Sequence, residues 1–203
     1  ETIFNKLKKK QINRYIYFKK IIKLLNKIQS IKNRKIKNFK NKNYKIPKYD
    51  NKILINEANL FCEWYVKKNL SKSNKNKFSK EFKRIIIKLT SNLELRNNVF
   101  VHRDFHVSNL MIVNNQIGVI DSQDALIGNR AYDLASLIDD VRLKTSKSFK
   151  RKIYNFYLKR QKKLEVKKFK NDFEILSILR NLKIIGIFTR LAIRDGKKHY
   201  LKL

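Results

Sequence analysis

Glycine and proline are scarce in this chain, and their scarcity limits the folds that it can adopt. Only 4 of the 203 residues are Gly and one is Pro, so few positions interrupt a helix. Apolar side chains recur at helical spacing through most of the sequence. We therefore expect helices over residues 11–29, about 54–68, 78–95, 132–143, 149–164 and 169–194.

Two stretches lack this pattern. Residues 30–50 are rich in Lys and Asn and contain the single proline, Pro47. We interpret them as a loop or a poorly ordered linker. The polar stretch 71–77 is interpreted as a break between two helices.

The middle of the chain predicts short strands instead, over Val99–Val101, Leu110–Val113 and Ile117–Ile120. Asn114 and Asn115 separate the last two, and Asn tolerates the left-handed backbone that a tight turn needs. The predicted fold class is α+β, a mostly helical lobe that carries a small β-hairpin.

The formal charge of +34 favours nucleic acid or an anionic membrane as a partner. Lys, Asn and Ile have A/T-rich codons, so genome composition is an alternative cause. Between Thr90 and Leu143 there is no Lys, and four Arg face seven acids, for a net charge of −3. A segment without lysine inside so basic a chain is typical of a place where a cation must bind, and we expect nucleic acid not to be the partner.

Compartment and membrane placement follow from two features. Cys62 is the only cysteine, so no intrachain disulfide is possible, and a cytoplasmic protein is expected. The apolar stretch 16–25 is interrupted by Lys19, Lys20 and Lys23, which predicts neither a signal segment nor a membrane span.

The run from His102 to Asp121 carries the chemistry. Asp104 follows a strand, Asn109 lies five residues later, and Asp121 ends the next hairpin. This spacing resembles the His-Arg-Asp…Asn and second-Asp pattern of kinase-like phosphotransferases. The hairpin is expected to return Asp121 beside the other two side chains.

Each residue then has a predicted role. Asp104 is the candidate catalytic base for a substrate hydroxyl. Asn109 and Asp121 are the candidate ligands of Mg²⁺ and, through it, of ATP, because Mg²⁺ prefers oxygen donors and binds few protein groups. His102 is expected to shape the loop by hydrogen bonding. The alternative is that these are ordinary turn residues.

Together with the patch from Asp121 to Ala135, this run resembles the aminoglycoside phosphotransferase and choline-kinase-like family. Its members show His-x-Asp-x-x-x-x-Asn, an Asp one hairpin later, and then Tyr-Asp-Leu-Ala, here Tyr132 to Ala135. The resemblance implies a protein-kinase-like C-lobe. It also implies that Asp133 holds the catalytic loop by accepting backbone N–H bonds, although a helix cap is an equal alternative.

Within the family, the chain is most similar to bacterial kinases that phosphorylate the anomeric hydroxyl of N-acetylmuramic acid or N-acetylglucosamine. This likeness covers residues from about 45 onward and includes Glu57, Trp64, Gly186 and Arg190. It implies an ATP-dependent small-molecule kinase whose acceptor is a sugar or amino sugar. The oligomeric state is left open.

The sequence departs from the family in two ways. Position 122 is Ser where these relatives carry Phe, and no Gly-rich loop or strand Lys is present upstream. We expect a missing nucleotide-binding N-lobe, followed by a basic helix and linker over 1–50 and the catalytic lobe over 51–203. An inactive kinase relative, a basic nucleic-acid-binding module, and a phosphatase or nuclease using the same acids are the competing hypotheses.

Other candidates are weaker. Arg190, Arg194 and Asp195 either contact substrate or end a helix before Gly196, and the latter is favoured. Trp64 and Tyr65 are expected at core positions rather than as a platform for a sugar ring. His106 and His199 lack the spacing of metal ligands.

Overall fold

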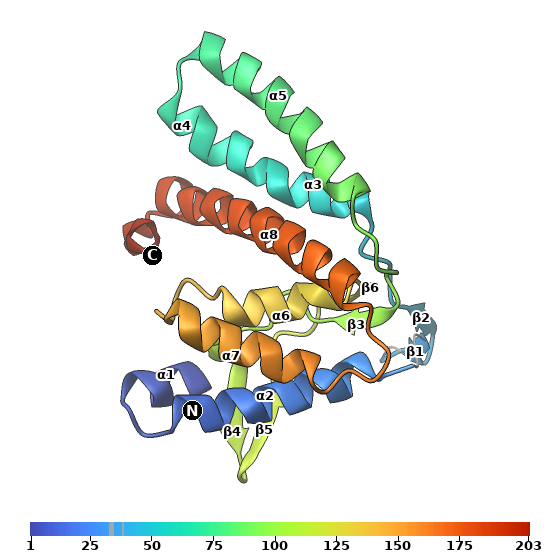
Figure 1. Ribbon diagram of the computed structural model, residues 1–203. Coiled ribbons are helices and arrows are strands. Elements are labelled where there is room, and N and C mark those ends of the chain that lie inside the picture. The colour runs from blue at the N-terminus through green and yellow to red at the C-terminus, as the bar shows by residue number, and fades with distance from the viewer. Residues whose placement is uncertain (33–34, 38) are drawn as a thin grey trace. The chain divides into compact units, whose positions relative to one another are not determined.

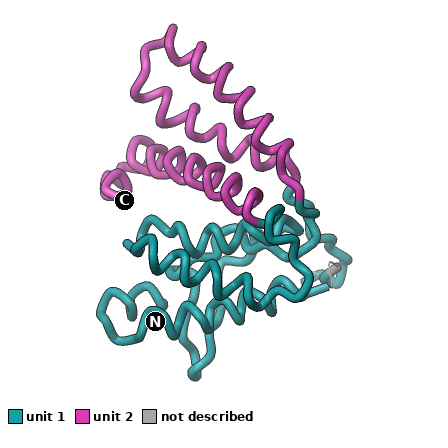
Figure 2. Tube along the Cα trace, in the orientation of Figure 1, with its two compact units in different colours: residues 1–49, 95–169 teal, residues 50–94, 170–203 magenta. Residues whose placement is uncertain are grey.

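The computed structural model describes residues 1–32, 35–37 and 39–203 (Figure 1). The chain packs into two compact units, residues 1–49 with 95–169, and residues 50–94 with 170–203 (Figure 2). Each unit therefore joins two separate stretches of sequence. The division of the chain at residue 50 into a basic segment and a catalytic lobe stays a prediction.

Four helices of the first unit begin after polar residues or at short turns. They are α1 (Ile3–Lys8), α2 (Arg14–Gln29), α6 (Ala131–Ile138) and α7 (Lys147–Leu158). The side chains of Asn13 and Ser146 each accept a hydrogen bond from the first turn of α2 and α7, which satisfies an otherwise unpaired N–H. Helix α2 packs on α7, where the rings of Phe18 and Phe149 meet edge to face at 5.0 Å.

Two small antiparallel sheets complete the core of this unit. β3 (Val99–Val101) pairs with β6 (Leu126–Gly128), and β4 (Leu110–Val113) pairs with β5 (Gln116–Val119). Asn114 and Asn115 connect β4 to β5 with φ of 48° and 60°, as the turn prediction required. The β3, β4 and β5 predictions are confirmed, with β5 shifted by one residue. The sequence analysis missed β6.

Residues 30–50 were predicted as a loop, and that prediction is wrong in part. β1 (Lys35–Lys37) and β2 (Asn43–Lys45) form an antiparallel hairpin in which Ile36 lies opposite Tyr44. Alternating Lys and apolar residues allow strand pairing even though the composition resembles a linker. Residues 33, 34 and 38 of the predicted loop lie outside the described part of the chain.

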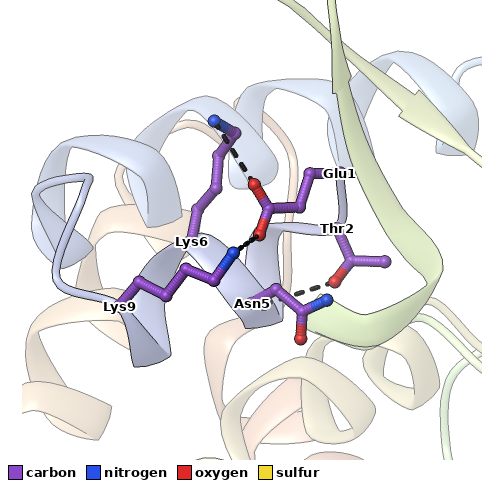
Figure 3. A network of polar contacts seen from close by, with 5 residues as sticks. All are labelled: Glu1, Thr2, Asn5, Lys6 and Lys9. Carbon is purple, nitrogen blue, oxygen red and sulfur yellow. Dashed lines mark hydrogen bonds and ion pairs between the residues drawn. The ribbon is translucent and has the colours of Figure 1, made fainter.

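The first residues of the chain add to the edge of β4. Thr2 forms an isolated antiparallel bridge with Met111, and the Glu1 carbonyl accepts the N–H of Ile112 at 3.3 Å. Figure 3 shows the Glu1 carboxylate between Lys9, at 2.8 Å, and Lys6, at 3.8 Å. The hydrogen bond from Lys9 lowers the pKa of this exposed carboxyl group. Helix α1, which the sequence analysis did not predict, thereby begins beside the β4–β5 hairpin.

The second unit is helical. It contains α3 (Asn51–Leu60), a π-helical turn η1 (Phe61–Val66), α4 (Lys67–Asn69), α5 (Lys72–Ser91), most of α8 (Val166–Arg194) and η3 (Lys198–Lys202). A Cβ at Gly186 of α8 would lie 2.4 Å from the carbonyl carbon of Leu60. The two helix backbones therefore touch at the point where α3 changes into η1. Nearby, the mostly buried pair Lys183 and Glu57 meets at 3.0 Å.

The predicted helices are present, but several of their ends differ. Helix α5 begins at Lys72, so the break predicted over 71–77 is wrong. Of the residues in that stretch, Ser71 alone lies outside the helix, directly before its first residue. Helix α6 ends at Ile138 rather than at 143, and α7 ends at Leu158 rather than at 164. The α+β class, mostly helical with small antiparallel sheets, is confirmed.

Candidate active site

Residues 102–109 form a loop between β3 and β4, and one buried carboxylate anchors its start. Asp133 in the first turn of α6 is fully buried and accepts the N–H of His102 at 2.7 Å and of Arg103 at 3.0 Å. Arg103 has a φ of 73°, a left-handed conformation that costs an L-residue about 1–2 kcal/mol. The two charge-assisted bonds offset this cost. Asn129 accepts the first N–H of α6 at 3.0 Å. The role of Asp133 in holding the loop stays a prediction.

Further along this loop, buried and partly exposed residues are mixed. Phe105 and Val107 are fully buried, which fixes the loop to the core. Asp104 and Asn109 are only partly buried. The Asn109 side-chain amide donates to the Asp104 carbonyl at 3.1 Å, and the N–H of His106 donates to the same oxygen at 3.0 Å. These bonds hold Asp104 and Asn109 on one short loop.

His102 links the loop to the end of the β4–β5 hairpin. Its Nε2 lies 3.0 Å from the carbonyl oxygen of Ile120, so Nε2 carries the proton in this contact. Burial lowers the pKa of the imidazole, while the Ile120 bond and the charges of Asp104 and Asp121 act in the opposite direction. His102 thus joins the start of the loop to the end of the hairpin.

Asp121 lies on the exposed side of this arrangement. The N–H of Ile120 donates to the Asn109 carbonyl at 3.1 Å, which brings the residue before Asp121 to the catalytic loop. Asp121 has a φ of 69°, and its Oδ1 accepts a hydrogen bond from Gln123 at 2.7 Å. The backbone thus brings the segments that carry positions 104, 109 and 121 together.

The donor set fits Mg²⁺ better than a metal that needs several protein ligands. No group of three or more His, Cys, Asp and Glu side chains suited to a metal exists among the described residues. Asp121 offers an exposed carboxylate, and Asn109 offers the oxygen of an amide whose nitrogen already bonds to Asp104. Mg²⁺ keeps several waters and takes one or two protein oxygens along with phosphate oxygens.

Sequence reasoning missed the side chains that hold the Asp121 segment. Gln123 bonds Asp121, and Arg103 donates to the Asp124 carbonyl at 3.1 Å while lying over the Tyr49 ring. The family pattern marks only the acids and the Asn. The absence of lysine between residues 90 and 143 was the one available signal that the arginines there have defined partners.

The weaker candidates have ordinary surroundings. Arg194, the last residue of α8, pairs with Asp195 at 2.6 Å. Gly196 follows Asp195 and has a φ of 67°. Tyr65 is 43% exposed, so the core position predicted for it is wrong. Trp64 lines an open groove of about 460 Å³ in the second unit.

The loop over residues 102–109 lies within the part of the chain that matches a known protein family. Residues 9–167 match the phosphotransferase enzyme family. The chain belongs to this family. Among curated proteins, it is 35% identical over 161 residues to an N-acetylmuramate/N-acetylglucosamine kinase of Neisseria meningitidis, covering 76% of this chain and 48% of that protein. The protein of the same name from Pseudomonas aeruginosa is 33% identical over 162 residues, covering 77% and 48%.

This phosphotransferase chain thus spans about half the length of the curated relatives that it matches. Its structure is similar to that of an ethanolamine kinase from Plasmodium vivax, with a TM-score of 0.62 and 18% identity over 93% of this chain and 58% of that one. At that identity the likeness shows the fold alone, and the predicted kinase-like fold is confirmed. Within the described residues no helix is both long enough and apolar enough to cross a membrane.

Proposed function

We propose that this chain carries the catalytic loop and a metal-binding carboxylate of an ATP-dependent phosphotransferase whose acceptor is a sugar or amino sugar hydroxyl. The observation that supports this most directly is the anchoring of the loop by Asp133, which leaves Asp104 and Asn109 partly exposed on one short segment. The names of the curated relatives support an amino sugar as the acceptor.

In this proposal each residue has one task. Asp104 accepts a hydrogen bond from the acceptor hydroxyl and finally takes its proton. Asp121 and the amide oxygen of Asn109 hold Mg²⁺, which when bound neutralises charge on the nucleotide phosphates. His102 and Asp133 keep the loop in place. Little covalent help from the protein is needed, because alignment and charge neutralisation supply most of the rate enhancement.

We infer that a nucleotide-gripping lobe, with a Gly-rich loop and a strand lysine, belongs to a longer protein. The family resemblance places such a lobe before the catalytic loop, and the matched segment covers 48% of the curated relatives. We place the reaction in the cytoplasm, where ATP and sugar precursors meet. Sequencing the DNA upstream of the Glu1 codon tests this inference, and an authentic start codon at that point would contradict it.

The activity test uses the full-length protein with ATP, Mg²⁺ and either N-acetylmuramate or N-acetylglucosamine, and it measures ADP release. Asp104→Asn is expected to lower kcat by roughly 10²–10⁴-fold with a smaller change in acceptor KM, because only the proton acceptor is lost. Asp195→Asn, at an exposed residue directly after α8, is the matched control and is expected to retain activity. Undiminished turnover in Asp104→Asn would refute the assigned base. A folded wild-type protein that releases no ADP with either sugar would refute the proposed acceptor class.

A further inference from the structure

Two consecutive residues of the catalytic loop contact the chain on opposite sides of Asp121. His102 bonds to the carbonyl of Ile120, one residue before Asp121, at 3.0 Å. Arg103 donates from Nη1 to the carbonyl of Asp124, three residues after Asp121, at 3.1 Å. The segment between these two contacts therefore has both of its ends tied to the same loop.

The Arg103 guanidinium is itself held in place. Its central carbon lies 5.5 Å from the centroid of the Tyr49 ring, within the range of a cation–π contact. Tyr49 is 2% exposed, and its N–H donates to the Ile127 carbonyl at 2.8 Å. Its ring also packs edge to face on Tyr132 at 4.9 Å. A buried ring, on a backbone that is itself hydrogen-bonded, thus gives the arginine a fixed support.

The segment that Arg103 holds has little support of its own. Residues 121–124 are all exposed, and two local bonds support them: the N–H of Ala125 donates to the Ser122 carbonyl at 3.1 Å, and Gln123 donates to the Asp121 carboxylate at 2.7 Å. Asp121 has a left-handed backbone with a φ of 69°. This conformation is strained in an L-residue and persists only where neighbouring contacts maintain it. An exposed and strained segment of this kind needs an external tie to keep one position.

We propose that Arg103 is a positioning residue that, together with His102, fixes the carboxylate of Asp121 relative to Asp104. This inference rests on the proposed function, because Asp121 is the metal-binding carboxylate in that proposal. Arg103 does not touch the phosphates in this role. Its guanidinium points to the Asp124 carbonyl and the Tyr49 ring, and it sets the geometry of the metal site through the backbone.

The chain contains a matched control for this arginine. Arg14 also donates from Nη1 to a backbone carbonyl, that of Lys144 at 3.0 Å, and its guanidinium lies 5.9 Å from the Phe149 ring centroid. Arg14→Gln therefore removes the same two kinds of contact at the start of α2, away from the catalytic loop. A difference in amide exchange between Arg103→Gln and Arg14→Gln therefore reports the effect of the contacts that are specific to Arg103.

The test is amide hydrogen–deuterium exchange in the full-length protein, which does not depend on catalysis. Exchange at the Ala125 amide, which donates to the Ser122 carbonyl at 3.1 Å, is expected to rise by about tenfold in Arg103→Gln, the effect of losing one bond from a charged donor. It is expected to be unchanged in Arg14→Gln. Arg103→Lys keeps the charge but lacks the planar fork, so its exchange is expected to be intermediate.

Kinetics supply the second measurement. Arg103→Gln is expected to raise the Mg²⁺ concentration needed for half-maximal rate more than it raises the acceptor KM. Exchange at the Ala125 amide equal to that of Arg14→Gln would overturn the inference whether or not the protein is active. A uniform rise that includes α2 and α7 would also overturn it, because Arg103 would then serve general stability. A wild-type protein without activity but with the local exchange effect would refute the proposed function and leave the positioning role standing.

Discussion

Replacing Asp133 by Asn tests whether one buried carboxylate fixes the catalytic loop. The carboxylate accepts two backbone N–H groups, at 2.7 and 3.0 Å, and the residue is fully buried. Asn keeps one acceptor oxygen but presents an NH₂ group to the second donor. One bond to a charged acceptor is lost, and a buried N–H of His102 or Arg103 is left unpaired.

The expected loss of unfolding free energy is about 2–3 kcal/mol, from one charge-assisted hydrogen bond and the penalty of an unsatisfied donor. Urea denaturation with a fixed m-value measures this loss. Exchange at the amides of residues 102–104 is expected to accelerate more than exchange in α2. The catalytic rate of the full-length protein falls as well, because Asp104 is adjacent to the released amides.

Asp172→Asn is the matched control. Asp172 is also fully buried and accepts the N–H of Glu94 at 2.9 Å, but it belongs to the second unit. Its variant is expected to lose comparable stability without selective exchange at residues 102–104. If Asp133→Asn stays within about 0.5 kcal/mol of wild type, or loosens the loop no more than Asp172→Asn does, the anchoring argument is wrong.

Two further predictions concern the close packing at Gly186 and the titration of His102. Gly186→Ala is expected to destabilise the protein by about 2 kcal/mol or more in urea denaturation, because its Cβ would lie 2.4 Å from Leu60. Gly118→Ala is the nearly neutral control, because its Cβ would meet no atom within 4 Å. Equal losses of stability in the two variants would contradict the close packing at Gly186. Burial lowers the pKa of His102 in the folded protein below 6.5, so the unfolded chain binds more protons at this residue. The stability that His102 contributes is therefore present above pH 6.5 and is lost as the pH falls through the folded pKa. His102→Gln, which retains a side-chain donor toward Ile120, is expected to flatten this part of the pH profile, and an unchanged profile would count against the buried neutral imidazole.

The sequence predicted elements whose signal is local. The paired Asn114 and Asn115 specify a tight turn by themselves, and the apolar runs beside them specify the two strands. β6 was missed because its three buried residues, Leu126–Gly128, show no alternation, and their strand character comes from pairing with β3 and from a bridge between Ile127 and Lys48. The π-helical turn of η1 was missed for a related reason. It occurs where Gly186 of α8 touches the chain, a contact between residues far apart in sequence.

The same distinction applies to the candidate site. A family pattern located Asp104, Asn109 and Asp121 because their spacing along the chain is fixed. It did not locate Arg103 as a support, because its partners are a backbone carbonyl and the ring of Tyr49, which lies more than fifty positions earlier. A backbone acceptor carries no side-chain signature, so such a contact becomes visible only in the structure.

Lysine avoidance around the loop can be explained by the contacts that its arginines make. Arg103 bonds a carbonyl and lies over a ring, and Arg142 pairs with the buried carboxylate of Asp140 at 3.1 Å. A planar guanidinium suits both tasks, whereas a flexible ammonium group suits neither as well. A lysine near Asp104 or Asp121 would also compete with Mg²⁺ for the carboxylates. The excess positive charge of this chain therefore lies outside the segment that carries the candidate chemistry.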